Sequence, residues 1–186
     1  MKTIERPMTL EEFDALPESN RPAQLIEGHL VGAPAPDRFH QRLSGAIYVA
    51  VYLHLEAHPD RGEVYQAPFE VQFPGVNVYQ PDVMFFTRAH LGRLTDKRAV
   101  GAPDLVVEIL SPSTARYDTG KKREVYARFG VAELWIVDPP RRSVSVYGLG
   151  QDPDQPLRVL KHSDVLRTAL LPGFELPLSR VFGREH

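Results

Sequence analysis

The residues that could do chemistry are charged side chains in segments that are otherwise apolar. Glu108 lies within the apolar run 106–110, where strand alternation places its side chain on the same face as Val106 and Leu110. Burying an unpaired carboxylate costs at least several kcal/mol, so Glu108 requires a cation, a hydrogen-bond network or water at a cleft. An ordinary buried ion pair or an exposed edge position would also satisfy it.

Asp82 is the second carboxylate of interest, because it follows Pro81 at the head of the apolar run 83–86. A Pro-Asp pair at the entrance of a strand is commonly just a turn, and alone it favours that interpretation. Taken with Glu108, however, it places two carboxylates at the ends of two predicted strands.

Lys122 is the third such residue, because helical geometry turns it toward the protein interior. At about 100° per residue over the predicted helix 118–129, Lys122 projects within roughly 15° of the centre of the apolar face formed by Val125, Tyr126 and Phe129. Asp118 and Tyr126 lie four residues to either side and share this inward stripe. The alternatives are snorkelling at the helix end or a simple pair with Asp118.

Two carboxylates and an inward lysine are the groups that metal-assisted phosphodiester hydrolysis needs. Magnesium takes one or two carboxylates, keeps several waters and accepts phosphate oxygens. The ion would polarise the phosphate and activate a water, and the lysine would orient that water or offset charge in the transition state.

The elements that position these residues alternate between helices and strands. We expect a mixed sheet in a single α/β or α+β domain spanning residues 1–186, with residues 1–20 as an N-terminal helical flap. A basic loop is expected between the strands 82–86 and 104–110. The remaining predicted elements are strands about Gly28, a helix over 37–56, one strand over 63–73, a strand over 134–137, a hairpin strand over 143–147 and a strand over 157–160.

Composition excludes several classes of protein. The chain has 186 residues, no cysteine and a formal net charge of −2, so it is neither disulfide-stapled nor a zinc ribbon. No apolar stretch is as long as that of a signal peptide or a membrane span, which predicts a soluble, cytoplasmic protein without membrane partners. Two stretches, 88–98 and 116–128, are locally basic and are either solvated faces or a groove for phosphates.

Several of these motifs together resemble the Uma-type family of bacterial endonucleases, which belongs to the PD-(D/E)XK restriction-endonuclease-like superfamily. The similarity covers nearly the whole chain, and its most specific part is the Glu-Ile-Leu-Ser-Pro-Ser-Thr block that begins at Glu108. The other matching positions are Gln80-Pro81-Asp82, Asp118, Lys122, Tyr126, Gly130-Val131, residues 133–139, Leu25-Ile26-Glu27-Gly28, His40 and residues 171–174.

The resemblance implies a central mixed sheet flanked by helices, with Asp82 and Glu108 as metal ligands and Lys122 as the catalytic lysine. The strict superfamily pattern places lysine two residues after the glutamate, where this chain has Leu110. Lys122 matches the displaced lysine of the family, in agreement with the helical-face argument. Gln24 stands where the family usually has an acidic residue, which puts a second metal ion in doubt.

The resulting prediction is a magnesium-dependent endodeoxyribonuclease, with Mn²⁺ as an alternative ion and DNA as the substrate. Gln24 would lie beside the site, and His40 would support it or be structural. The superfamily implies a homodimer. Two alternatives stay open: a catalytically inactive nucleic-acid-binding or interaction module of the same fold, and a metal hydrolase with a substrate other than DNA.

Overall fold

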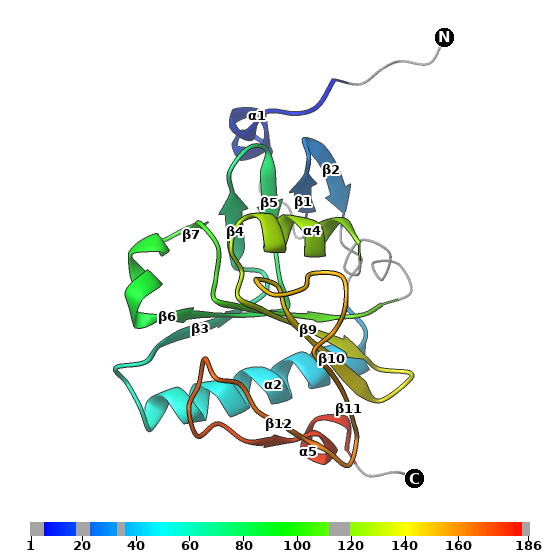
Figure 1. Cartoon of the computed structure of the whole chain (residues 1–186). Coiled ribbons are helices and arrows are strands. Elements are labelled where there is room, and N and C mark those ends of the chain that lie inside the picture. Colours follow the sequence, from blue (N-terminus) through cyan, green and yellow to red (C-terminus); the bar gives the residue numbers. More distant parts are fainter. Residues whose placement is uncertain (1–5, 18–22, 33–35, 112–119, 184–186) are drawn as a thin grey trace.

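The computed structural model describes residues 6–17, 23–32, 36–111 and 120–183. Two sheets and the helices between and below them form layers (Figure 1). In that view a five-stranded sheet lies uppermost, helix α4 (Lys121–Arg128) lies beneath it, a six-stranded sheet crosses the middle, and helix α2 (Arg38–Glu56) runs below. The predicted mixed sheet flanked by helices is therefore confirmed.

The six-stranded sheet carries Glu108 in one strand and has Asp82 at the entrance of the neighbouring strand, and its strand order is β11-β10-β9-β8-β6-β3. Strands β8 and β9 are parallel, and all other neighbours in this sheet are antiparallel. The strands are β3 (Gly62–Gln66), β6 (Val83–Thr87), β8 (Leu105–Ile109), β9 (Glu133–Asp138), β10 (Ser143–Gly148) and β11 (Arg158–Lys161).

The five-stranded sheet was not predicted as a separate layer. Its order is β2-β1-β5-β4-β7, and its hairpin turns at Gly28, where φ is +80°. The short helix α1 (Leu10–Asp14) begins with a capping box of Thr9 and Glu12 and packs Phe13 against this sheet. The strands are β1 (Ala23–Ile26), β2 (His29–Gly32), β4 (Glu70–Phe73), β5 (Asn77–Tyr79) and β7 (Arg98–Val100).

Helix α2 covers one face of the six-stranded sheet. Asp37 caps its start by accepting a hydrogen bond from the backbone N–H of His40. Apolar residues then recur every four positions and enter a core that also includes Trp135 of β9 and the C-terminal helix α5 (Leu178–Phe182). The buried residues of α2 are Leu43, Ile47, Val51 and Leu55.

Helix α4 covers the opposite face of the six-stranded sheet. Val125 and Tyr126 of α4 enter a second core, between this sheet and the five-stranded one. Gly130 follows the helix with φ of +87°, the left-handed conformation that commonly ends a helix. The two cores leave the six-stranded sheet buried on both sides, which explains the nearly continuous apolar runs of β6 and β8.

Two local predictions were wrong. The predicted strand 63–73 is two strands in different sheets, because Pro68 has no N–H to continue a ladder and the chain turns there after a cis Ala67-Pro68 bond. The predicted basic loop contains the 3₁₀ helix η1 (Arg88–Arg93) and strand β7, whose partner β4 lies more than twenty residues away.

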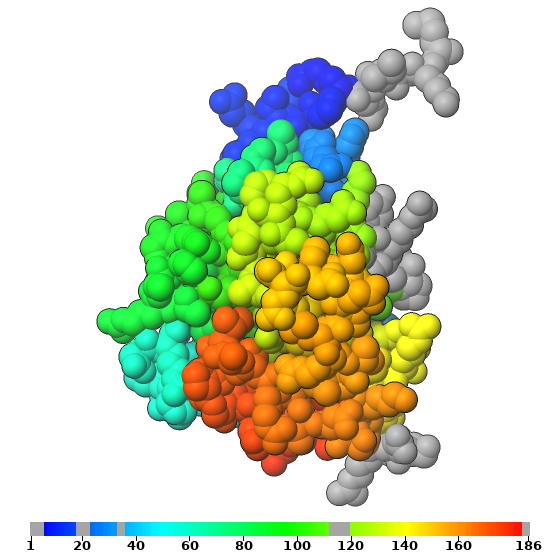
Figure 2. All heavy atoms as spheres, viewed as in Figure 1, coloured from blue at the N-terminus to red at the C-terminus, as the bar shows by residue number. Residues whose placement is uncertain are grey.

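The C-terminal segment completes the lower layer. After β11 the chain forms a two-stranded ribbon of β12 (Val165–Leu166) and β13 (Leu176–Pro177) and ends in α5, which packs against α2. Figure 2 shows the segment after β10, in orange, spread over the front of the molecule. In the part of the chain that the structure describes, none of the helices is both long and apolar enough to cross a bilayer.

The first prediction compares two glycines. A Cβ at Gly62, where φ is +143°, would lie 2.0 Å from the carbonyl oxygen of Phe86, so Gly62→Ala should lower the free energy of unfolding by about 3 kcal/mol. A Cβ at Gly45, inside α2, would meet no described atom within 4 Å, so Gly45→Ala should raise it by about 0.5 to 1 kcal/mol. Urea denaturation measures both, and equal effects would contradict the close approach at Gly62.

Candidate active site

Glu108 lies in β8, and Asp82 immediately precedes the adjacent antiparallel strand β6. The ladder of β6 and β8 pairs Val83 with Val107 and Met84 with Val106. Continuing this register by one residue sets Asp82 opposite Glu108, and opposite residues of an antiparallel ladder share a face. That face carries Met84 and Val106 into the core below α4. Register alone would therefore place the two carboxylates on one side of the sheet, while Asp82 also contacts His40 of α2, the helix that covers the opposite side.

Asp82 is held by one backbone and one side-chain contact. Its Oδ2 accepts a hydrogen bond of 2.7 Å from the backbone N–H of Ile109 and lies 3.3 Å from His40 Nε2. Its side chain is 16% exposed, so the carboxylate is largely but not completely shielded from water. Both contacts fall on Oδ2, and no described residue bonds Oδ1, which leaves that atom available to a ligand.

His40 reaches Asp82 from the first turn of α2. Burial is the largest single cause and lowers the pKa of its imidazole, but the contact and charge of Asp82, with smaller contributions from Asp37 and the backbone of Ile109, together raise the pKa above 6.5. A positive imidazolium is thus favoured beside Asp82. His40 therefore supports the carboxylate from the helix, which is more specific than the sequence alone indicated.

Glu108 forms the most deeply buried polar contact of the site. Its side chain is 3% exposed and that of Lys122 is 4% exposed, and Lys122 Nζ donates to Glu108 Oε1 over 3.1 Å. The hydroxyl of Tyr126 donates to the same oxygen. The lysine and the tyrosine come from successive turns of α4, four residues apart, as the predicted inward stripe requires.

Tyr126 is fixed in place by other aromatic rings. Its ring meets that of Tyr79 edge-on at 5.7 Å and that of Phe73 at 5.6 Å. Burial raises the pKa of the Tyr79 hydroxyl, which donates to Asn77 Oδ1. These rings come from β4 and β5, so the five-stranded sheet helps to aim a hydroxyl of α4 at Glu108.

Gln24 is buried and lies at the start of a polar chain within the five-stranded sheet. Its side-chain oxygen accepts the backbone N–H of Gln80 over 3.2 Å, two residues before Asp82. The Gln80 amide donates to Glu70, and Glu70 pairs with Arg98 at 3.0 Å. This row of polar contacts positions the segment that leads to Asp82. The sequence analysis did not identify Gln80, Glu70 and Arg98 as contributors to the site. Gln80 stands in the Gln-Pro-Asp motif, whereas nothing in the sequence signals Glu70.

Several side chains of the two basic stretches are paired within the protein. Lys121 contacts Glu27 at 2.5 Å, and Arg123 contacts Asp154 at 3.0 Å while its guanidinium lies over the ring of Tyr147. In the other stretch, Arg93 donates to the carbonyl of Ala102 and Arg98 pairs with Glu70. The three cations paired with carboxylates are thus partly neutralised, while Arg93 keeps its charge but is held by a backbone carbonyl, which favours solvated and paired faces over a continuous phosphate groove. Asp118, the remaining predicted site residue, lies outside the described residues.

The donors at the site suit an ion that keeps water ligands. Among residues 6–17, 23–32, 36–111 and 120–183, no three His, Asp or Glu side chains meet in a cluster that could enclose a metal. Two facing carboxylates are nevertheless the usual protein contribution to a magnesium site. Gln24 adds no charge. The residues present therefore fit one hydrated divalent cation better than a pair.

Comparisons with known proteins agree with the architecture. The sequence profile of the Uma2 family, described as "Putative restriction endonuclease", matches residues 10–179. The fold is similar to the crystal structure of a "putative nuclease belonging to DUF820" from Anabaena variabilis, with a TM-score of 0.79 and 22% identity over 95% of this chain and 98% of that one. The fold is thus restriction-endonuclease-like. No curated protein matches the sequence.

A double-mutant cycle tests the buried pair. Lys122→Met leaves the carboxylate of Glu108 without its lysine and should lower the free energy of unfolding by about 3 kcal/mol. Glu108→Gln should cost a similar amount, and the double variant should regain at least about half of the summed loss. Lys121→Met, which removes an exposed pair, should cost less than about 1 kcal/mol. Additive losses in the cycle would contradict the pairing.

The raised pKa of His40 gives a pH dependence with a definite sign. An imidazole whose pKa is raised by folding adds stability that is fully present below its ordinary value of 6.5 and is lost as the pH rises through the raised value. NMR titration should therefore find His40 above 6.5 in the metal-free protein, and Asp82→Asn should lower its pKa. The stability lost in Asp82→Asn should be larger at about pH 5 than at about pH 8. An unchanged His40 titration would show that Asp82 does not act on it.

Proposed function

Because the chain belongs to the Uma2 family, we propose that it is a metal-dependent endonuclease that hydrolyses phosphodiester bonds of DNA. Family membership and fold support a nuclease in general. The observation that carries the finer proposal is that Lys122 is buried against Glu108. Asp82 comes opposite Glu108 when the ladder of β6 and β8 is continued by one residue. A lysine paired with one carboxylate, with a second carboxylate close by along the strands of a restriction-endonuclease-like sheet, has the composition of a nuclease centre.

Asp82 and Glu108 are the residues that would hold the cation, with Mg²⁺ as the expected ion and Mn²⁺ as its substitute. A bound divalent cation supplies Lewis acidity toward a phosphate oxygen and lowers the pKa of a bound water. Asp82 offers Oδ1, which no described residue bonds, and His40 with the backbone of Ile109 keeps Oδ2 in place.

Lys122 contributes a fixed positive charge in a site from which most water is excluded. In such surroundings an ammonium stabilises the negative charge that builds on a phosphate more effectively than in bulk water. It can also donate a hydrogen bond that orients the attacking water. The hydroxyl of Tyr126 and the ammonium of Lys122 donate to the same oxygen of Glu108. The tyrosine would therefore keep the carboxylate in place when the lysine donates a hydrogen bond to substrate.

The proposed substrate is DNA, and the proposed location of the protein is the cytoplasm. The pairing of Lys121, Arg98 and Arg123 with carboxylates of the protein indicates that affinity for phosphates depends on a limited set of cations. The affinity for DNA should then fall only gradually as the salt concentration rises, since each phosphate contact adds about one unit to the slope of log affinity against log salt concentration.

Cleavage of plasmid DNA with and without Mg²⁺ tests the proposal. Asp82→Asn, Glu108→Gln and Lys122→Met should each lower the cleavage rate by at least about 100-fold. Lys121→Met, one residue away but exposed, should change the maximal rate by less than about threefold and act, if at all, on DNA affinity. Thermal unfolding of each variant shows that it is folded at the assay temperature.

Calorimetry with Mn²⁺ separates binding of the ion from catalysis. The heat of binding should disappear in Asp82→Asn and Glu108→Gln and persist in Lys122→Met, because only the carboxylates are proposed ligands. If the wild-type protein binds neither Mg²⁺ nor Mn²⁺ and leaves plasmid DNA intact, the proposal is overturned in favour of an inactive module of the same fold. Activity on small phosphodiesters but not on plasmid would overturn the choice of DNA.

A further inference from the structure

Helix α2 is apolar on two opposite faces, and among the described residues other elements cover only one of them. Val49 is 50% exposed, Tyr52 is 42% exposed and Leu53 is 61% exposed. A surface helix normally carries charged or polar residues on the side away from the core. At about 100° per residue, Val49 lies diametrically opposite the centre of the buried face.

The residues around Val49 form what we call the outer stripe of α2, and they are arranged by size. The small residues Gly45 and Ala46 lie about one turn before Val49, and the large residues Tyr52 and Leu53 lie about one turn after it. The ring of Tyr52 stacks on that of Tyr48 at 6.0 Å, which limits its motion. The full stripe comprises Arg42, Gly45, Ala46, Val49, Tyr52, Leu53 and Glu56.

No packing contact among the described residues requires a glycine at position 45. A Cβ at this position would meet no described atom within 4 Å, and glycine inside a helix costs about 0.5 to 1 kcal/mol relative to alanine. A helix pair brings two backbones to within about 8 to 10 Å, where a glycine makes room for a large side chain of the neighbour. Gly45 therefore indicates an approach from outside.

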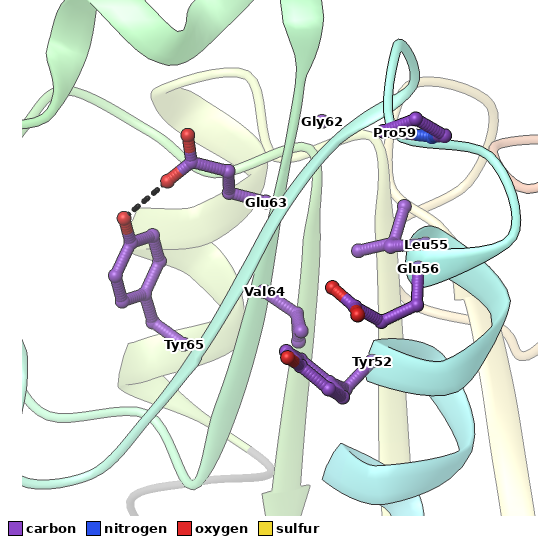
Figure 3. A pocket seen from close by; sticks show the side chains of 8 residues that line it. All are labelled: Tyr52, Leu55, Glu56, Pro59, Gly62, Glu63, Val64 and Tyr65. Atoms are coloured by element: carbon purple, nitrogen blue, oxygen red, sulfur yellow. Dashed lines mark hydrogen bonds between the residues drawn. The ribbon is translucent and has the colours of Figure 1, made fainter.

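The stripe is also arranged by charge. Arg42 lies two turns before Val49 and is exposed, with its guanidinium beside Gly183 and no ion pair to a described residue. Glu56 lies two turns after Val49. Glu56 raises the pKa of the neighbouring Tyr52 hydroxyl. Figure 3 shows the side chains of Tyr52 and Glu56 beside a pocket of about 290 Å³ between the end of α2 and β3. Glu63 points away from this pocket, toward Tyr65. An arginine from outside could thus reach Glu56.

We propose that two copies of this chain associate through the outer stripe of α2, with the helices antiparallel and a two-fold axis at Val49. Rotation about that axis places residues whose numbers sum to 98 opposite each other. Arg42 then faces Glu56 of the second copy, Gly45 faces Leu53, and Ala46 faces Tyr52, so charge and size are both complementary. Such an interface is isologous, because the same patch serves both copies.

The pairing keeps the two candidate active sites apart. His40 marks the site end of each helix, nine residues from the axis, so the two His40 backbones lie about 27 Å apart along antiparallel helices. Neither site then borrows a residue from the other copy. Dissociation should leave the activity of each site unchanged, and this proposal stands or falls independently of nuclease function.

Charge reversal gives a test that folding defects cannot imitate. Arg42→Glu and Glu56→Arg should each raise the dissociation constant, measured by sedimentation equilibrium, by about tenfold, because two pairs become repulsive. An equimolar mixture of the two single variants should form heterodimers with about the wild-type constant, since both pairs are restored in that combination. The doubly reversed chain should also dimerise with about the wild-type constant.

The cysteine-free sequence allows a second measurement. Val49→Cys, on the axis, should give a disulfide-linked dimer under mild oxidation, whereas Val159→Cys, equally exposed on the edge strand β11, should not. A single contact between two helices is small, so we expect a dissociation constant of about 1 to 100 μM. A protein that stays monomeric at about 500 μM, or a dimer indifferent to every charge reversal, would overturn the proposal, and a different occupant would then cover the stripe.

Discussion

Glu108 and Lys122 form an ion pair in which both side chains are almost fully buried, at 3% and 4% exposure. Neither charge is tolerable in that place without the other, because an isolated ion loses the solvation that water would give it. A well-packed apolar pair would stabilise the sheet at least as well, so stability alone does not account for the pair. A carboxylate and an ammonium in the middle of the fold are better explained by chemistry.

The surrounding structure holds this pair in place from several directions. Strand β8 fixes Glu108 between β6 and β9, and helix α4 delivers Lys122 and the hydroxyl of Tyr126 to one of its oxygens. The five-stranded sheet backs the tyrosine with aromatic rings. On the other side of the sheet, α2 contributes His40, which holds Asp82. The two cores thus converge on one short stretch of sheet.

The sequence predicted the parts of the site that depend on local geometry. Helical periodicity placed Lys122 on the inner face of its helix, and strand alternation made Glu108 a buried charge, because both patterns follow from the backbone of a single element. The family resemblance confirmed by the Uma2 profile joined them to Asp82. The roles of these residues are still predictions.

The parts that were missed depend on contacts between distant segments. Pro68 divides the predicted strand 63–73 between two sheets, and a run of alternating residues gives no sign of which sheet each half joins. Glu70 meets Arg98 because β4 pairs in parallel with β7, a strand more than twenty residues away. The contact of His40 with Asp82 likewise depends on how α2 crosses the sheet, which no local pattern determines.

The most direct test of a cation site between the two carboxylates is an anomalous diffraction measurement on crystals soaked in manganese. The account predicts one strong peak that touches both Asp82 and Glu108, with water completing its coordination and with Lys122 still beside Glu108. No peak at these residues, or a peak bound by neither carboxylate, would contradict it.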